Sequence, residues 1–401
     1  MESVCTLIAY RGFESHSLRH SATIPVTALI FRKRRNIQSM FAAAEILAAI
    51  VLSGSAPRPE SMSLPVSFRN GKVTLAGTLF LPQGTERHPA VVLFHSANGG
   101  ERDFHAYQHL ATVLPGVGIA VLLYDRRGSG ASTGNFNTAT FEDLARDGIA
   151  AVRYLKTRSD IDRRRIGAWG VSQGGWVAPL AATLSSDIAF VVAVSAPGVT
   201  PAAQMDYSAT NRLRTTGWPH EVVEKAIRVR DVVNDYYRGR ASRDYAQKAI
   251  MQIRNEPWFN DVFLPNGGNL PDDPTKTKWR GQMDYDPLAV FARVRVPTVF
   301  FFAEHDAWVP VEESINNVRR VMSANPQVTI ERILGTDHLM ENGIPDSGGE
   351  TSRSYIDRLL AWFQRTIAPK IAHNAPAISP HASIDEARKR NADGIRDAAC
   401  A

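Results

Sequence analysis

The sequence predicts an α/β fold, a doubly wound and mostly parallel sheet of eight strands with a helical cap inserted into it. Short apolar runs alternate with amphipathic segments of helix length, and one long interval breaks this alternation. Strands that alternate with helices are typical of a parallel sheet covered on both faces. With 44% apolar residues among 401, the chain can bury a large core.

Apolar or alternating runs predict the eight strands, and the first two should form an antiparallel start to the sheet. These runs lie at residues 64–69, 72–81, 90–95, 118–124, 165–169, 189–194, 298–303 and 327–333. Helical periodicity predicts the helices that alternate with the later strands. They lie at residues 103–114, 140–157, 174–185, 311–322 and 352–366.

The interval between the sixth and seventh predicted strands predicts the cap. It holds helical stretches at 221–237 and 242–255, followed by a polar passage rich in Gly and Pro at 264–276. An insertion at this point should lie over the strand edge and shape a pocket. Its aromatic residues either line that pocket or pack the cap on itself. They are Trp218, Tyr236, Tyr237, Trp258 and Phe259.

The chain therefore divides into a core and a cap, with a segment outside the fold at each end. The core takes residues 61–196 and 289–367, and the cap takes 197–288. Residues 1–60 are predicted to be a leader. Residues 368–401, rich in Pro, Ala, His and mixed charges, predict a loosely ordered tail.

The turn after the fifth predicted strand carries the most informative motif, Gly170-Val171-Ser172-Gln173-Gly174. A serine on a sharp strand-to-helix turn exposes its hydroxyl above the carboxyl edge of the sheet, and flanking glycines permit the turn. A second match, around Ser132, leads into polar residues and indicates a glycine-rich loop. Ser172 is therefore the predicted nucleophile, and the N–H of Gln173 is a predicted oxyanion donor.

The order of the remaining polar residues completes a catalytic triad. A serine hydroxyl needs a base, and the base needs a third group that orients it. Asp306 follows the seventh strand and His338 the eighth, so both should lie at the sheet edge that carries Ser172. Glu304 competes with Asp306 but is closer to the strand. His305 competes with His338 but adjoins the acid, which makes Ser172, Asp306 and His338 the predicted triad.

With these motifs, the chain resembles bacterial serine hydrolases of the α/β-hydrolase superfamily, in the esterase and acyl-peptidase-like branch. The resemblance runs from about Leu64 to Thr366, and its further pieces are residues 75–82, 125–134 and 140–147. It implies a second oxyanion N–H in the loop after the third strand. The family usually has His-Gly there, whereas this chain has His95-Ser96. The implied donor is Ala97, with Ser96 as the alternative.

The resemblance implies a serine hydrolase that cleaves carboxylic esters through an acyl-enzyme, with a small-molecule ester as its partner and no cofactor. An acyl-peptidase or a thioesterase could use the same triad. A non-catalytic binding protein on a hydrolase fold is the alternative from another class. His105 and His109 have a spacing that can hold a metal, but no third ligand is evident, so no metal site is predicted.

The net charge of +6 does not indicate a nucleic-acid partner. Much of it lies in residues 1–40, and the basic clusters elsewhere are short and lack interleaved aromatic residues. Cys5 and Cys400 lie near opposite ends of the chain, so no structural disulfide is predicted. Nothing in the sequence indicates an oligomeric state.

The leader resembles a secretory signal. A basic run at 32–35 precedes an apolar run at 46–52, and cleavage would follow Ala56. The apolar run is too short to span a bilayer as a helix, so no stable membrane span is predicted. We expect export to the periplasm or to the outside of the cell. Glu45, at the edge of the apolar run, favours the alternative of a cytoplasmic enzyme with a leader.

Overall fold

The computed structural model describes residues 62–342 and 349–367. The predicted leader and tail lie outside these residues. The chain divides into two compact units, Met1–Leu360 and Ala361–Ala401. The sheet, the segment between its sixth and seventh strands, and the candidate site all belong to the first unit.

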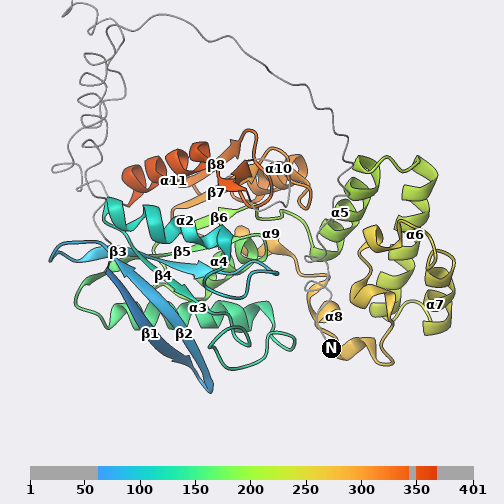
Figure 1. Cartoon of the computed structure of the whole chain (residues 1–401), viewed down its shortest axis with the longest axis horizontal. Helices are drawn as coiled ribbons and strands as arrows, with labels where there is room; N and C mark the ends of the chain where they lie inside the picture. The colour runs from blue at the N-terminus through green and yellow to red at the C-terminus, as the bar shows by residue number, and fades with distance from the viewer. Residues whose placement is uncertain (1–61, 343–348, 368–401) are drawn as a thin grey trace, which may run out of the picture. The chain divides into compact units, whose positions relative to one another are not determined.

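Eight strands form one sheet in the order β1-β2-β4-β3-β5-β6-β7-β8 (Figure 1). The strands are β1 (Met62–Asn70), β2 (Val73–Leu81), β3 (His88–Phe94), β4 (Ala120–Tyr124), β5 (Ile161–Val171), β6 (Val191–Val194), β7 (Thr298–Ala303) and β8 (Val328–Ile333). The β1–β2 and β2–β4 pairs are antiparallel, and all other pairs are parallel. The predicted mostly parallel sheet with an antiparallel start is confirmed.

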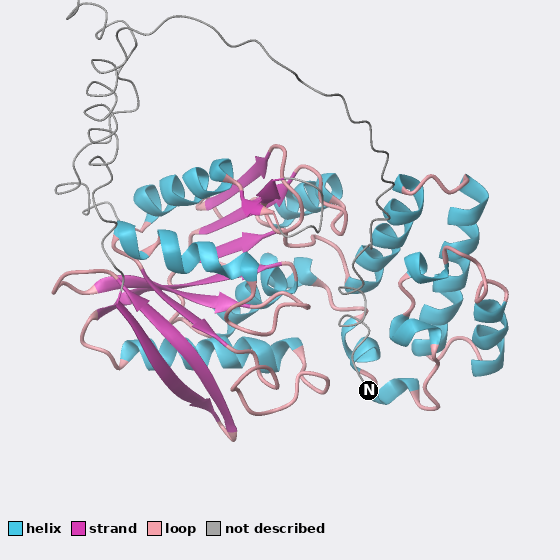
Figure 2. Cartoon of the chain, in the orientation of Figure 1, coloured by secondary structure: helices cyan, strands magenta, loops and turns pink. Residues whose placement is uncertain are grey.

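Helices lie on both faces of this sheet (Figure 2). They are α2 (His105–Val113), α3 (Phe141–Lys156), α4 (Gln173–Leu184), α10 (Val311–Val321) and α11 (Arg353–Thr366). Adjacent residues of β5 point to opposite faces. Ala168 joins the core beneath α3 and α4, whereas the Trp169 ring contacts Tyr107 of α2. Among the described residues, the longest helices are too short or too polar to cross a membrane.

The central strands form a rigid platform because they are buried along their whole length. Every residue of β3, β4 and β7 is buried, as suits strands covered on both faces. The polar residues that follow these strands therefore start from fixed positions at one edge of the sheet.

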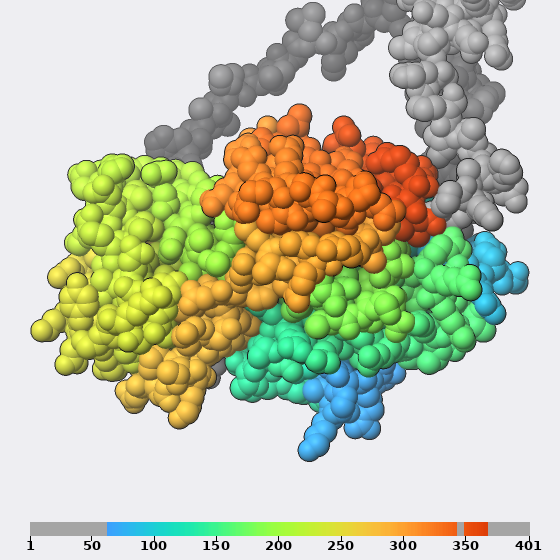
Figure 3. All heavy atoms as spheres, turned by 180° about the vertical axis from the view of Figure 1, so that it is seen from behind, coloured from blue at the N-terminus to red at the C-terminus, as the bar shows by residue number. Residues whose placement is uncertain are grey.

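The segment between β6 and β7, which we call the insertion, is helical. Its helices are α5 (Pro201–Thr215), α6 (His220–Tyr237), α7 (Arg243–Met251), α8 (Lys278–Gln282) and α9 (Pro287–Phe291), with short 3₁₀ helices at Phe259–Val262, Pro265–Gly268 and Pro274–Lys276. Helix α5 was not predicted, although Thr200 caps its first turn and Pro201 occupies its first position. The space-filling view shows α6 and α7, in yellow-green, gathered into one mass (Figure 3).

The insertion has a hydrophobic core of its own. Tyr236, Tyr237 and Trp258 are buried in it, and Trp218 and Phe259 pack against it. The aromatic residues considered as pocket candidates therefore pack the insertion on itself, which is the second of the two predicted alternatives.

A small hairpin follows β8 and was not predicted. Its strands are β9 (Glu341–Asn342) and β10 (Glu350–Thr351), paired antiparallel. Each strand has two residues, too few to produce a recognisable alternation in the sequence.

Candidate active site

The turn from β5 into α4 holds Ser172 in a conformation that side chains rarely adopt. Its φ is 57° and its ψ is −117°. The backbone is fixed from both sides, because Ser172 N–H donates to Val194 O (2.9 Å) and Gly175 N–H donates to Ser172 O (2.8 Å). This is the geometry expected of a nucleophile elbow.

Two glycines permit this turn because backbone atoms approach them closely. A Cβ on Gly170 would lie 2.1 Å from the carbonyl oxygen of Gly174. A Cβ on Gly174 would lie 2.1 Å from the carbonyl oxygen of Phe94. Any larger residue at either position would force the turn, α4 and β3 apart.

Asp306 and His338 form a close buried pair at the same edge of the sheet. His338 Nδ1 lies 2.9 Å from each carboxylate oxygen of Asp306. The Oδ1 atom also accepts the backbone N–H groups of Trp308 and Val309, both at 2.9 Å. The carboxylate is thus fixed by the backbone, and its bond to Nδ1 directs the proton of a neutral imidazole to that nitrogen. The Nε2 atom is then free of a proton and able to act as a base.

The structure places Ser172 at this edge without bonding it to the pair. It follows β5, whereas Asp306 follows β7 and His338 follows β8. Within the described residues, the Ser172 hydroxyl makes no hydrogen bond, to His338 or to any other group. Catalytic hydrogen bonds are often long in the absence of substrate and form on binding.

The rival residues are occupied elsewhere. The Ser132 hydroxyl donates to Asp125 O (2.6 Å) and accepts from Ala76 N–H (3.0 Å). The His305 side chain is 66% exposed and pairs with Glu304 at 3.5 Å. Neither of these interactions involves the Asp306–His338 pair.

In the loop after β3, the backbone N–H groups of Ser96 and Ala97 differ in their bonding. Ser96 N–H donates to the Tyr107 hydroxyl (2.9 Å), which in turn donates to Gly99 O (2.7 Å). Among the described residues, Ala97 N–H and Gln173 N–H have no acceptor. The alternative donor Ser96 is therefore occupied, while both predicted donors are available. Burial raises the pKa of Tyr107 to about 12, which keeps its hydroxyl protonated.

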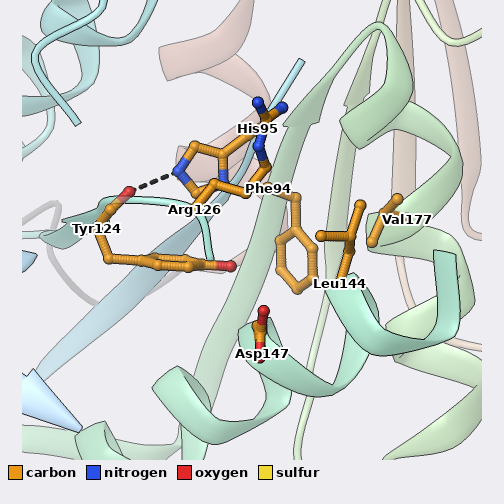
Figure 4. A pocket seen from close by; sticks show the side chains of 7 residues that line it. All are labelled: Phe94, His95, Tyr124, Arg126, Leu144, Asp147 and Val177. Carbon is orange, nitrogen blue, oxygen red and sulfur yellow. Dashed lines mark hydrogen bonds between the residues drawn. The ribbon is translucent and has the colours of Figure 1, made fainter. Parts of the chain in front are cut away.

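Beneath this loop lies a buried cation that the sequence analysis did not single out. Arg126 is 7% exposed, and its Nη1 donates to Ser96 O (2.8 Å) and Ala97 O (2.9 Å). Figure 4 shows it beside His95, whose Nε2 lies 2.5 Å from Tyr124 O. Burial, reinforced by the Arg126 charge, lowers the pKa of His95 to about 3, so this ring is neutral.

Helix α5 of the insertion holds the loop that carries Asp306. Three of its side chains donate to three successive backbone carbonyls of that loop. The pairs are Tyr207 with Asp306 (3.3 Å), Asn211 with Ala307 (3.2 Å) and Ser208 with Trp308 (3.1 Å). The Trp308 ring also lies 5.3 Å from the Phe263 ring of the insertion.

The two histidines with metal-like spacing have different surroundings. His105 lies 3.2 Å from Glu341. The His109 ring packs between Trp169 and Tyr355, each at 5.5 Å, and burial lowers its pKa to about 4.

Comparison with known proteins shows which protein family the sequence matches. Residues 91–343 match the sequence profile of the Alpha/beta hydrolase family, which is well over half of the chain. Esterase EstD of Thermotoga maritima is 27% identical over 314 residues, which cover 75% of this chain and 68% of EstD.

Two further relatives show how far the likeness extends. An uncharacterized protein of Mycobacterium tuberculosis is 30% identical over 167 residues, 40% of this chain and 57% of that protein. The chain thus spans little more than half the length of that relative. The crystal structure of the α/β hydrolase GrgF from Penicillium sp. sh18 superposes with a TM-score of 0.50 at 20% identity, over 77% of this chain and 99% of GrgF. That likeness shows the fold.

Proposed function

The chain belongs to the α/β-hydrolase family, and on this premise we propose that it is a serine hydrolase that cleaves carboxylic esters through an acyl-enzyme. The observation that carries the proposal is the buried Asp306–His338 pair at the sheet edge where the Ser172 turn lies. The esterase name of EstD, which covers three quarters of the chain, supports the ester as substrate.

In the first half of the reaction, Ser172 Oγ attacks the carbonyl carbon of the ester while His338 Nε2 accepts the hydroxyl proton. The backbone N–H groups of Gln173 and Ala97 stabilise the negative charge on the former carbonyl oxygen. The tetrahedral intermediate then breaks its bond to the alkoxy oxygen. His338 returns the proton to that oxygen, so the alcohol leaves and the acyl group stays on Ser172.

In the second half, water takes the place of the alcohol. His338 Nε2 accepts a proton from the water as its oxygen attacks the acyl carbon, and the same N–H groups stabilise the oxyanion. Collapse of this intermediate breaks the bond to Ser172 Oγ, which regains the proton. Throughout, Asp306 orients His338 and stabilises its protonated form. The net reaction is ester plus water to acid plus alcohol.

The test is hydrolysis of p-nitrophenyl esters from acetate to palmitate by the wild type, Ser172→Ala and Ser132→Ala. We expect Ser172→Ala to abolish turnover while its melting temperature stays near that of the wild type. Ser132→Ala, which alters the other match to the motif, should retain turnover. Full turnover by folded Ser172→Ala would contradict the proposal.

The same experiment separates the alternative substrates. Wild-type protein that is labelled at Ser172 by a fluorophosphonate but does not cleave the esters would have an active serine and another acyl substrate. An acyl-peptide and an acyl thioester would then be compared directly. If the wild type showed no turnover and no labelling, that result would favour a non-catalytic binding protein.

A further inference from the structure

We propose that Arg126 is a positioning residue for the oxyanion hole, because it holds the peptide group whose N–H end is the donor at Ala97. This inference rests on the proposed serine hydrolase activity. It assigns a role in catalysis to a buried charge that acts through the backbone of the loop.

The argument starts from the geometry of one peptide group. The carbonyl of Ser96 and the N–H of Ala97 belong to the same planar unit and point in opposite directions. Arg126 Nη1 donates to that carbonyl at 2.8 Å. Because the group is planar, fixing the direction of its oxygen also fixes the direction of its N–H.

The same nitrogen also fixes the next peptide group. Arg126 Nη1 donates to Ala97 O at 2.9 Å, so the guanidinium holds the carbonyls on both sides of Ala97. Bonds from a charged donor are stronger than neutral ones. The cation also draws electron density toward the Ser96 carbonyl, which makes the N–H at the other end of the peptide group a better donor to an oxyanion.

Ser96 and Gly99 of the loop are bonded within the fold. Ser96 N–H and Gly99 O both bond to the Tyr107 hydroxyl, and Gly99 N–H donates to the Ser96 hydroxyl at 3.0 Å. Arg126 donates to the carbonyls of Ser96 and Ala97. Among the described residues, Ala97 N–H and Asn98 N–H have no acceptor, and Arg126 holds the peptide group of each; Ala97 N–H is the proposed oxyanion donor.

Arg126 packs on an aromatic ring that the insertion also contacts. Its Cζ lies 3.3 Å from the centroid of the Phe136 ring, and Lys278 Nζ lies 2.9 Å from the same centroid. Lys278, the first residue of α8, also donates to Phe136 O at 2.9 Å. Cations near an aromatic ring are stabilised by its negative face. The contact therefore connects α8 to the oxyanion loop through one ring.

The experiment compares Arg126→Met, Arg126→Gln and Arg126→Lys with Arg127→Met, the control at the adjacent arginine. Arg127 pairs with Asp147 at 2.6 Å and, within the described part of the chain, makes no hydrogen bond to the loop at residues 96–99. Steady-state ester hydrolysis gives kcat and KM. The Ki of a trifluoromethyl ketone reports the stability of the oxyanion directly, because this inhibitor forms a hemiketal oxyanion on the serine.

We expect Arg126→Met and Arg126→Gln to lower kcat by about 10-fold or more, since loss of a whole oxyanion donor costs about 10²–10³-fold. The Ki for the ketone should rise by the same factor as kcat/KM falls, and KM should change little. The kcat and Ki of Arg126→Lys should lie between those of these two variants and those of the wild type. Arg127→Met should leave Ki unchanged even where it lowers stability.

The outcome can overturn the inference independently of the proposed function. Irreversibly unfolded protein lowers the apparent kcat but leaves Ki unchanged, and a melting temperature well above the assay temperature shows that reversible unfolding does not contribute to Ki. Arg126 variants that lose activity with an unchanged Ki would show a purely structural role for the residue. Wild-type protein that neither hydrolyses esters nor binds the ketone would instead overturn the proposed serine hydrolase itself.

Discussion

Tyr207, on helix α5 of the insertion, donates a hydrogen bond from its hydroxyl to the backbone carbonyl of Asp306 at 3.3 Å. The neighbouring bond from Asn211 to Ala307 is of similar length, at 3.2 Å. The insertion therefore holds the backbone on which the proposed triad acid is mounted. A change in the position of α5 would change the position of the Asp306 carboxylate.

Removal of these bonds should weaken catalysis without unfolding the protein. Each hydrogen bond of this kind contributes about 0.5–1.5 kcal/mol. We therefore expect the double variant Tyr207→Phe/Asn211→Ala to lower kcat about 3- to 30-fold in ester hydrolysis. Arg214→Ala, at an exposed position of the same helix, is the control and should match the wild type. Unchanged kcat in the double variant would show that the loop keeps its position without α5.

The Asp306 carboxylate should be needed for catalysis far more than for folding. Its Oδ1 accepts two backbone N–H groups, and both of its oxygens face His338 Nδ1. In Asp306→Asn an amide N–H₂ can face the imidazole and favour the wrong tautomer, so we expect kcat to fall roughly 10³–10⁴-fold. The measurement is p-nitrophenyl ester hydrolysis.

Glu304→Gln provides the matched control for that change. Glu304 is exposed and accepts Gly335 N–H at 2.8 Å, away from His338. The control should keep activity within a few-fold of the wild type. A large loss in Glu304→Gln with little loss in Asp306→Asn would identify Glu304 as the acid.

The elbow should not tolerate a methyl group. In Gly174→Ala, the new Cβ would lie 2.1 Å from Phe94 O, a backbone atom of a fully buried strand. We expect the free energy of unfolding in urea to fall by about 1–3 kcal/mol or more. Gly281→Ala, in α8 with no atom within 4 Å of the new Cβ, should be neutral or slightly stabilising. Equal stability of the two variants would contradict the close packing of α4 on β3.

The stability of the fold should depend on pH through His109. Burial lowers its pKa to about 4, from 6.5 in an unfolded chain. Between these values the unfolded chain binds a proton that the folded protein excludes, so stability is complete above about pH 6.5 and falls as the pH falls. The slope from one such group is about 1.4 kcal/mol per pH unit.

His109→Phe should remove that part of the slope, and urea unfolding between about pH 7 and pH 5 would show it. His95, whose pKa is lowered to about 3, adds a similar slope that the variant retains. Met251→Phe, at an exposed position without a titratable group, is the control and should leave the slope unchanged. A slope that is the same in His109→Phe and the wild type would show that this ring is protonated in the folded protein.

The strands were predictable because their signal is local. Runs such as Ala90 to Phe94 and Thr298 to Ala303 are apolar throughout, as strands covered on both faces must be. The order of the elements then placed Ser172, Asp306 and His338 after β5, β7 and β8, so the fold alone brings these residues to one edge. Their chemical roles remain predictions.

Helix α5 and Arg126 were harder to predict for a common physical reason. Each acts through hydrogen bonds to backbone carbonyls, as Arg126 does with Ser96 O and Asn211 with Ala307 O. Every residue has such a carbonyl, so no residue type in the partner segment marks the contact. Helix α5 also carries many polar residues, among them Asp206, Tyr207 and Ser208, which hide its periodicity.

The backbone of Ser172 implies a trade-off between folding and activity. A non-glycine residue in such a conformation costs about 1–3 kcal/mol, whereas glycine adopts it readily. Ser172→Gly should therefore be inactive in ester hydrolysis and yet melt at a higher temperature than the wild type. If so, the wild-type protein is less stable than a variant that differs from it only at residue 172. Ser172 would lower the stability of the fold, and it is also the residue that the proposed chemistry requires.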